Sequence, residues 1–129
     1  MAIADSIREI RSTLPPHVRL VAVSKTKPPE DIMEAYGAGQ RLFGENKAQE
    51  LAAKYPLMPA DTEWHFIGHL QTNKVKIIAP LVSMIHSVDS LRLLQVIDRE
   101  ASLLGRVIPC LLEFRIAGEE TKFGLSRTE

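Results

Sequence analysis

The chain has 129 residues, of which 45% are hydrophobic and 25% are charged, and its 16 basic residues are balanced by 16 acidic ones. This composition is that of a soluble globular domain and excludes a disordered, collagen-like or coiled-coil chain, while the lack of a basic surplus argues against binding to nucleic acid. No apolar run approaches the roughly 20 residues of a membrane span and no secretory signal is evident, so we expect a cytoplasmic protein without a membrane role.

Hydrophobic periodicity divides the chain into alternating helical and extended segments. Apolar residues at helical spacing predict an N-terminal helix within residues 1–14, ahead of the first strand. Gly44 and Gly68 follow predicted strands and are expected to form turns. Short apolar runs predict strands at residues 19–23, 41–43, 63–67, 83–86 and 107–116, and the helical patterns between them cover residues 28–39, 46–54, 70–81 and 89–104.

Strands that alternate with helices predict a parallel α/β sheet built through right-handed crossovers. Five such cycles without a break in composition favour the (β/α)8 TIM barrel over an open doubly wound sheet, and no GxGxxG motif follows any strand. Five strands cannot close an eight-stranded barrel, and Ser126 and Glu129 have the spacing of a capping box that opens a further helix. We therefore interpret residues 1–129 as a single domain that forms the N-terminal portion of a longer barrel.

Ligands of parallel α/β proteins bind at the carboxyl ends of the strands, and polar side chains gather there in this sequence. Lys25 is the most informative of them, because strand alternation places Val21, Val23 and Lys25 on one face. An apolar setting disfavours a charged ammonium group, and a free amine condenses with an aldehyde to form a Schiff base. The alternative is an ordinary solvated lysine at the end of a strand.

Other polar candidates have structural explanations beside the functional ones. Asn46 has the preferences of a helix N-cap, and His86 is equally compatible with an ordinary position at a strand end. His65 and His69 have a spacing that binds zinc on a helix, but they flank a predicted turn, so no metal site is expected. Cys110 lies in an apolar run and is expected to be a small buried hydrophobic residue that forms no internal disulfide.

Several multi-residue motifs, in order from about residue 18 to residue 125, resemble those of the pyridoxal phosphate homeostasis proteins. That family consists of single-domain barrels similar to the N-terminal domain of alanine racemase. The sequence departs from the family at Lys47, Ala48, Arg115 and Phe123. The matching motifs are Val23-Ser24-Lys25-Thr26-Lys27-Pro28, Phe43-Gly44-Glu45-Asn46 with Gln49-Glu50, Trp64-His65-Phe66-Ile67-Gly68-His69-Leu70-Gln71 with Asn73-Lys74, Ile85-His86-Ser87-Val88-Asp89-Ser90, and Gly118-Glu119-Glu120 followed by Lys122 and Gly124-Leu125.

The resemblance implies that Lys25 carries pyridoxal 5′-phosphate (PLP) as a Schiff base, with Asn46 near the ring of the cofactor. For His86, at the end of its strand, the functional interpretation is stacking on that ring. It implies a non-catalytic carrier or buffer of PLP, with PLP-dependent apo-enzymes as recipients. Loops that hold the phosphate are expected beyond residue 129. Two alternatives stay open. One is a PLP-dependent racemase or lyase; racemases use a tyrosine as the second acid or base opposite the lysine, and this chain has Tyr36 and Tyr55. The other is an inactive fragment that self-associates.

Overall fold

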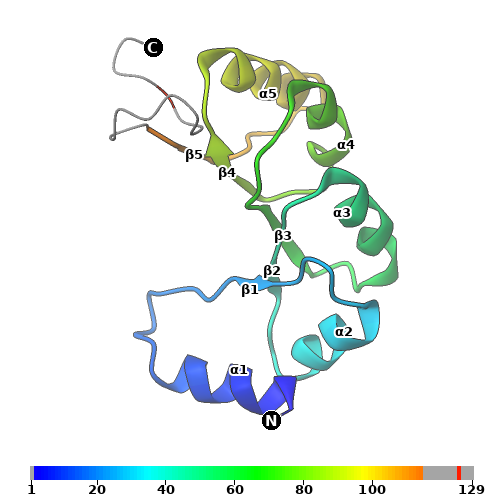
Figure 1. Ribbon diagram of the computed structural model, residues 1–129, viewed down its shortest axis with the longest axis vertical. Coiled ribbons are helices and arrows are strands. Elements are labelled where there is room, and N and C mark those ends of the chain that lie inside the picture. Colours follow the sequence, from blue (N-terminus) through cyan, green and yellow to red (C-terminus); the bar gives the residue numbers. More distant parts are fainter. Residues whose placement is uncertain (1, 115–124, 126–129) are drawn as a thin grey trace.

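The computed structural model describes residues 2–114 and residue 125. Its five strands form one parallel sheet in the order β1-β2-β3-β4-β5, with helices on the connections between them (Figure 1). The strands are β1 (Ala22–Val23), β2 (Leu42–Glu45), β3 (Glu63–Phe66), β4 (Met84–Val88) and β5 (Cys110–Leu112), and the helices are α1 (Ile3–Ser12), α2 (Pro29–Gly37), α3 (Ala48–Lys54), α4 (Val75–Ile78) and α5 (Leu91–Leu103), with 3₁₀ turns η1 (Tyr55–Leu57) and η2 (Thr72–Lys74).

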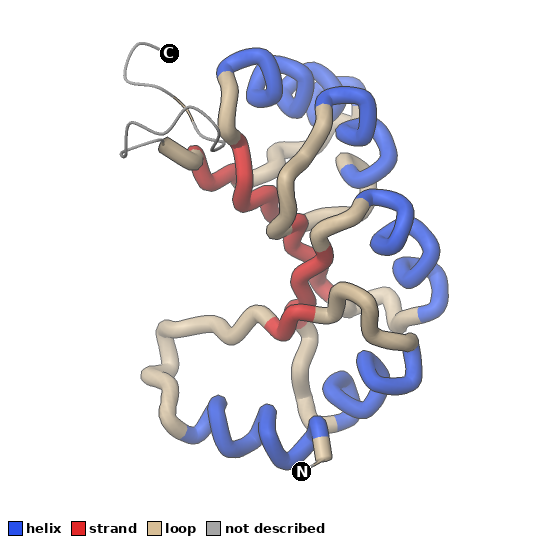
Figure 2. Tube along the Cα trace, in the orientation of Figure 1, coloured by secondary structure: helices blue, strands red, loops and turns tan. Residues whose placement is uncertain are grey.

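The described residues form an arc. The strands line its concave side and α2 to α5 cover its convex side, while α1 lies beside α2 at the end of the arc near β1 (Figure 2). Each strand pairs in parallel with the next one along the chain, for example with Phe43 opposite Trp64. The predicted alternation of strands and helices and the parallel pairing are therefore confirmed.

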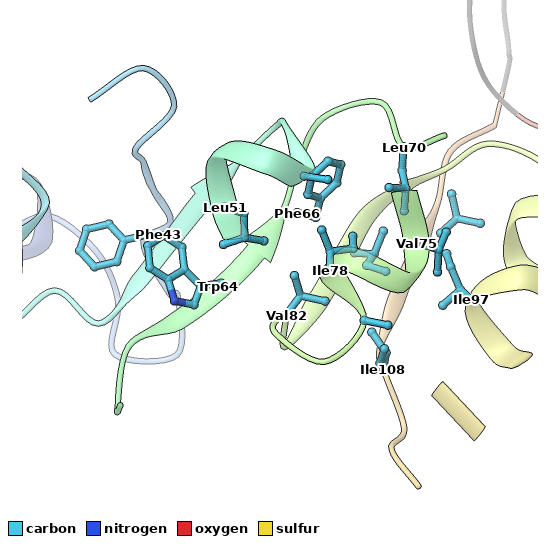
Figure 3. Close-up of a cluster of buried hydrophobic side chains, with 14 of the residues drawn as sticks. Phe43, Leu51, Trp64, Phe66, Leu70, Val75, Ile78, Val82, Ile97 and Ile108 are labelled. Atoms are coloured by element: carbon cyan, nitrogen blue, oxygen red, sulfur yellow. The ribbon is translucent and has the colours of Figure 1, made fainter. Parts of the chain in front are cut away.

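The hydrophobic core lies between the sheet and the helices. Phe43 and Trp64 point to this side from neighbouring strands, with ring centroids 5.8 Å apart, and Leu51 of α3 is fully buried beside them (Figure 3). Alternate residues of a strand point to opposite faces. Since Phe43 faces the helices, Leu42 and Gly44 face the concave side of the sheet, which is where a parallel barrel has its interior.

Several predicted boundaries are wrong. Gly44 is not a turn but a buried residue inside β2. A Cβ there would lie 2.8 Å from Ile67 Cδ1 and 3.0 Å from Val21 Cγ1, so glycine leaves room for these two side chains. Asn46 does not cap a helix, since α3 begins at Ala48 after an N-cap at Lys47 that makes no side-chain hydrogen bond. The helix predicted over residues 70–81 is reduced to η2 and the four residues of α4. Pro80 limits its C-terminal end, because proline lacks an N–H and clashes with the preceding turn.

The second half of the chain follows the prediction more closely. The Ser90 side chain caps α5 by accepting a hydrogen bond from the Leu93 amide at 3.0 Å, and Gly105 follows the helix with a φ of +65°. The fifth strand is shorter than predicted, and residues 115–116 of that prediction and the capping box at Ser126 lie outside the described residues. None of the helices among the described residues is long and apolar enough to cross a membrane.

Candidate functional site

Lys25 lies two residues after the end of β1, at the carboxyl end of the sheet. Its side chain is exposed, and Val23, two residues earlier, is 53% exposed. The described residues therefore do not form the apolar surroundings that the sequence predicts for Lys25, because no other layer packs over the concave face of β1 among them. What they do provide is an accessible amine at the predicted edge of the sheet.

The backbone on both sides of Lys25 is fixed. Before it, the Ser24 amide donates to Gly44 O at 3.0 Å, and Ser24 O accepts from Lys54 Nζ at 2.7 Å. After it, the Thr26 amide donates to Glu50 Oε2 at 2.5 Å. Thr26 has a φ of +61°, which a β-branched residue rarely adopts. Such backbone strain persists only where the surroundings enforce it.

A buried charge network of Ser24, Glu45, Glu50 and Lys54 makes these contacts. The Lys54 ammonium group uses all three of its protons, donating to Ser24 O, to Glu45 Oε2 at 2.9 Å and to Glu50 Oε2 at 2.7 Å. The side chains of Glu45 and Lys54 are 0% and 8% exposed. The Ser24 hydroxyl also donates to Glu45 Oε2, while Glu45 Oε1 has no hydrogen-bond partner among the described residues.

The charge network also sets the ionisation of Glu50. Burial by itself raises the pKa of this carboxyl group, but the hydrogen bonds from Lys54 and from the Thr26 amide lower it, and the net result is a pKa below the ordinary value. Glu50 is therefore an anion at neutral pH, and an anion accepts hydrogen bonds more strongly than a neutral group does.

Sequence reasoning missed this charge network. One usable signal was the spacing of Phe43 and Glu45, which places the carboxylate on the helix-facing side of β2. The other was the pair Glu50 and Lys54, four residues apart on one helix.

Asn46 follows β2 and contacts the loop that follows β3. A Cβ added to Gly68 would lie 2.4 Å from Asn46 Cβ and 2.6 Å from Asn46 O, so the two loops touch where glycine leaves room. Asn46 is partly buried. Within residues 2–114, no hydrogen bond or ion pair joins the side chain of Lys25 to that of Asn46 or His86. Lys25 and Asn46 follow β1 and β2, whereas His86 lies inside β4.

His86 of β4 pairs with His65 of β3. Their Nε2 and Nδ1 atoms are 2.8 Å apart, and the ring centroids are 4.9 Å apart at an interplanar angle of 57°. Burial lowers the pKa of both rings below the ordinary value of 6.5, and the neighbouring charge of His86 lowers that of His65 further. Both rings are thus neutral at pH 7, and one ring nitrogen donates to the other.

His69, which lies four residues after His65 in the sequence, pairs with an aspartate. Its Nδ1 lies 3.2 Å from Asp89 Oδ2. No group of three or more histidine, cysteine, aspartate or glutamate side chains in the described part of the chain could hold a metal ion. Cys110 is partly buried, and burial raises the pKa of its thiol.

We expect acid to destabilise the fold through the histidine pair. Because the pKa of each ring is lower in the folded state, the contribution to stability is complete above pH about 6.5 and is lost as the pH falls towards the folded pKa values. Urea unfolding at pH about 8 and about 5 measures the loss. His86→Gln should reduce the difference between the two pH values, whereas His17→Gln, a change at an exposed histidine, should not. Equal pH dependence in all three proteins would contradict this assignment.

Comparison with known proteins relates the chain to one group. No family model matches the sequence. The pyridoxal phosphate homeostasis proteins of Synechocystis sp. and Aquifex aeolicus are 45% and 46% identical to it over 123 and 108 residues. These alignments cover 94% and 83% of this chain but only 56% and 47% of the relatives, so the chain spans about half the length of the curated relatives it matches.

Solved structures agree with the sequence comparison. PipY of Synechococcus elongatus without PLP superposes with a TM-score of 0.89 at 43% identity, over 95% of this chain and 58% of PipY. The same protein with PLP bound gives a TM-score of 0.85 over 56% of its chain. Alanine racemase from E. faecalis, at 16% identity and a TM-score of 0.68, shares the fold. The predicted fold class, part of an α/β TIM barrel, is therefore confirmed. Over about half the length of these relatives, the chain is similar in sequence and in fold to the pyridoxal phosphate homeostasis proteins.

Proposed function

We propose that the protein is a non-catalytic carrier or buffer of PLP and that Lys25 binds the cofactor through a Schiff base. The observation that carries this proposal is an exposed amine, at the carboxyl end of the first strand, whose neighbouring residues are fixed by a buried charge network. The relatives named for PLP homeostasis and the PipY structure with PLP bound support the choice of ligand.

The chemistry at Lys25 is reversible. The uncharged Nζ adds to the aldehyde carbon of PLP, and loss of one water leaves a carbon–nitrogen double bond. Addition of water reverses the reaction and releases the aldehyde. A lysine at an open strand end can therefore both capture PLP and return it to solution or to a cytoplasmic PLP-dependent apo-enzyme, as a carrier requires.

The other two predicted residues fit the ring of PLP. Asn46, held against Gly68, offers an amide at the same edge of the sheet. His86 is a neutral, partly buried ring on β4, paired with His65, and a neutral imidazole offers a flat surface for stacking. We therefore propose that Asn46 contacts the ring edge and that His86 lies against its face.

The tyrosines do not favour a racemase. An acid or base opposite Lys25 would have to reach the substrate carbon. The Tyr36 hydroxyl instead donates to Asp61 Oδ1 at 2.5 Å, and an Arg41 guanidinium lies 3.7 Å from the centre of its ring. Tyr55 lies in η1, which follows directly on helix α3. Both tyrosines thus lie away from the concave face, which favours a binding role.

Substitution of Lys25 tests the proposal. The chain mixed with PLP should develop the visible absorbance of a Schiff base, and borohydride reduction should fix one PLP onto Lys25, as identified by peptide mass spectrometry. Lys25→Ala should abolish this adduct, a loss of more than about tenfold, because no other group replaces the nucleophile. Lys27→Ala, the control at a neighbouring exposed lysine, should retain it. A reduced adduct of equal amount on Lys25→Ala would overturn the assignment.

A further inference from the structure

We infer that Glu50 is a positioning residue for Lys25, and that it acts by holding the Thr26 amide. The inference rests on the proposed function, because it concerns how the reactive amine is presented. Glu50 Oε2 accepts from the Thr26 amide at 2.5 Å and from Lys54 Nζ at 2.7 Å, so one carboxylate oxygen joins the loop that carries Lys25 to helix α3.

The two anchors of this loop come from one helix. Lys54 binds Ser24 O on one side of Lys25, and Glu50 binds the Thr26 amide on the other. Lys54 and Glu50 are themselves an ion pair, four residues apart in α3. Lys25 is thus the residue between two anchored neighbours, and its exposed side chain projects from a backbone of fixed geometry.

Thr26 adopts a strained backbone conformation while its amide makes the contact with Glu50. Its φ of +61° brings its amide to the carboxylate although threonine disfavours that region. Without an acceptor for the amide, Thr26 is free to return to a negative φ. The peptide between Lys25 and Thr26 would then rotate and the amine would leave its position at the end of the strand.

The most deeply buried charge of the network, that of Glu45, does not depend on Glu50 for its partner. Lys54 pairs separately with the fully buried Glu45 at 2.9 Å, and the Glu50 side chain is itself 22% exposed. Changes at Glu50 can therefore be expected to leave the fold intact, so that effects on Lys25 can be measured in a folded protein.

Two substitutions of Glu50 separate the effect of its hydrogen bond to the Thr26 amide from the effect of its negative charge. Glu50→Asp keeps the negative charge beside Lys54 but withdraws the oxygen from the Thr26 amide, whereas Glu50→Gln removes the charge but keeps an oxygen within reach. If Glu50 positions Lys25, Glu50→Asp slows capture of PLP by about tenfold or more, and Glu50→Gln changes the rate by less than about threefold. Glu34→Asp is the matched control, since Glu34 also accepts a backbone amide, that of Ala4 at 3.1 Å.

Hydrogen exchange of the Thr26 amide gives a readout that needs no PLP. Exchange should quicken about tenfold in Glu50→Asp and stay near the original rate in Glu50→Gln. The inference would be overturned if the two variants showed the opposite order, or no difference, in the rate of PLP capture and in the exchange rate of the Thr26 amide. Failure of the unaltered chain to form a Lys25 adduct would refute the proposed function instead, while the order of exchange rates would still decide whether Glu50 holds the loop.

Discussion

Lys54→Met should lower the free energy of unfolding by about 3–5 kcal/mol. The Lys54 ammonium group is the partner of the Glu45 carboxylate, whose side chain is fully buried, and it satisfies Ser24 O and Glu50 Oε2 as well. Methionine keeps the apolar length of the side chain but leaves Glu45 as an unpaired charge away from water. Urea unfolding at neutral pH, followed by circular dichroism, measures the difference.

Two further variants show whether the buried charge is the cause. Lys47→Met removes a lysine from an exposed position just before the same helix and should cost no more than about 1 kcal/mol. Adding Glu45→Gln to Lys54→Met removes the unpaired charge and should recover part of the lost stability. If Lys54→Met cost as little as Lys47→Met, the charge network would have no structural importance.

The charge network also shows where sequence reasoning stops. Glu45 lies between Gly44, which the sequence predicts to form a turn, and the predicted helix at residues 46–54, and Lys54 stands on that helix among other polar residues. Burial of these charges depends on which face of β2 meets the helices. A shift of one residue in the strand exchanges its two faces, and the short strand at residues 42–45 gives too few positions to fix that choice from hydrophobicity.

Other features of the fold were accessible from local pattern. The amphipathic periodicity over residues 89–104, with Gly105 after it, predicts a helix that the structure contains almost in full as α5. The position of Lys25 after the first strand follows from the same kind of pattern. Its surroundings do not, because they depend on contacts with residues far away in the chain, such as Glu50 and Lys54, that strand alternation does not reveal.

The pairing of His65 with His86 belongs to the same class of feature. Spacing along the chain draws attention to His65 and His69, yet the register of β3 and β4 brings His65 to His86 instead. Residues on adjacent strands are neighbours only when the register is known. The candidate site is therefore predictable as a set of strand ends and not as a set of contacts.

Gly68→Ala should destabilise the protein by about 1–3 kcal/mol. The new Cβ would lie 2.4 Å from Asn46 Cβ, 2.6 Å from Asn46 O and 2.7 Å from Asn46 Cα. Two of these three atoms are backbone, so the loops after β2 and β3 must separate. Gly68 O also accepts a hydrogen bond from the Ser87 hydroxyl of β4, so a displaced Gly68 would disturb this contact as well. The urea midpoint measures the loss.

Gly37→Ala is the matched control for Gly68→Ala. Gly37 is the last residue of α2, and a Cβ there has nothing within 4 Å, so alanine should stabilise the helix by up to about 1 kcal/mol. Because Asn46 belongs to the proposed PLP site, Gly68→Ala should also weaken PLP capture at Lys25 while Gly37→Ala leaves it unchanged. If Gly68→Ala lost stability but captured PLP normally, Asn46 would be a structural residue and would have to be removed from the site.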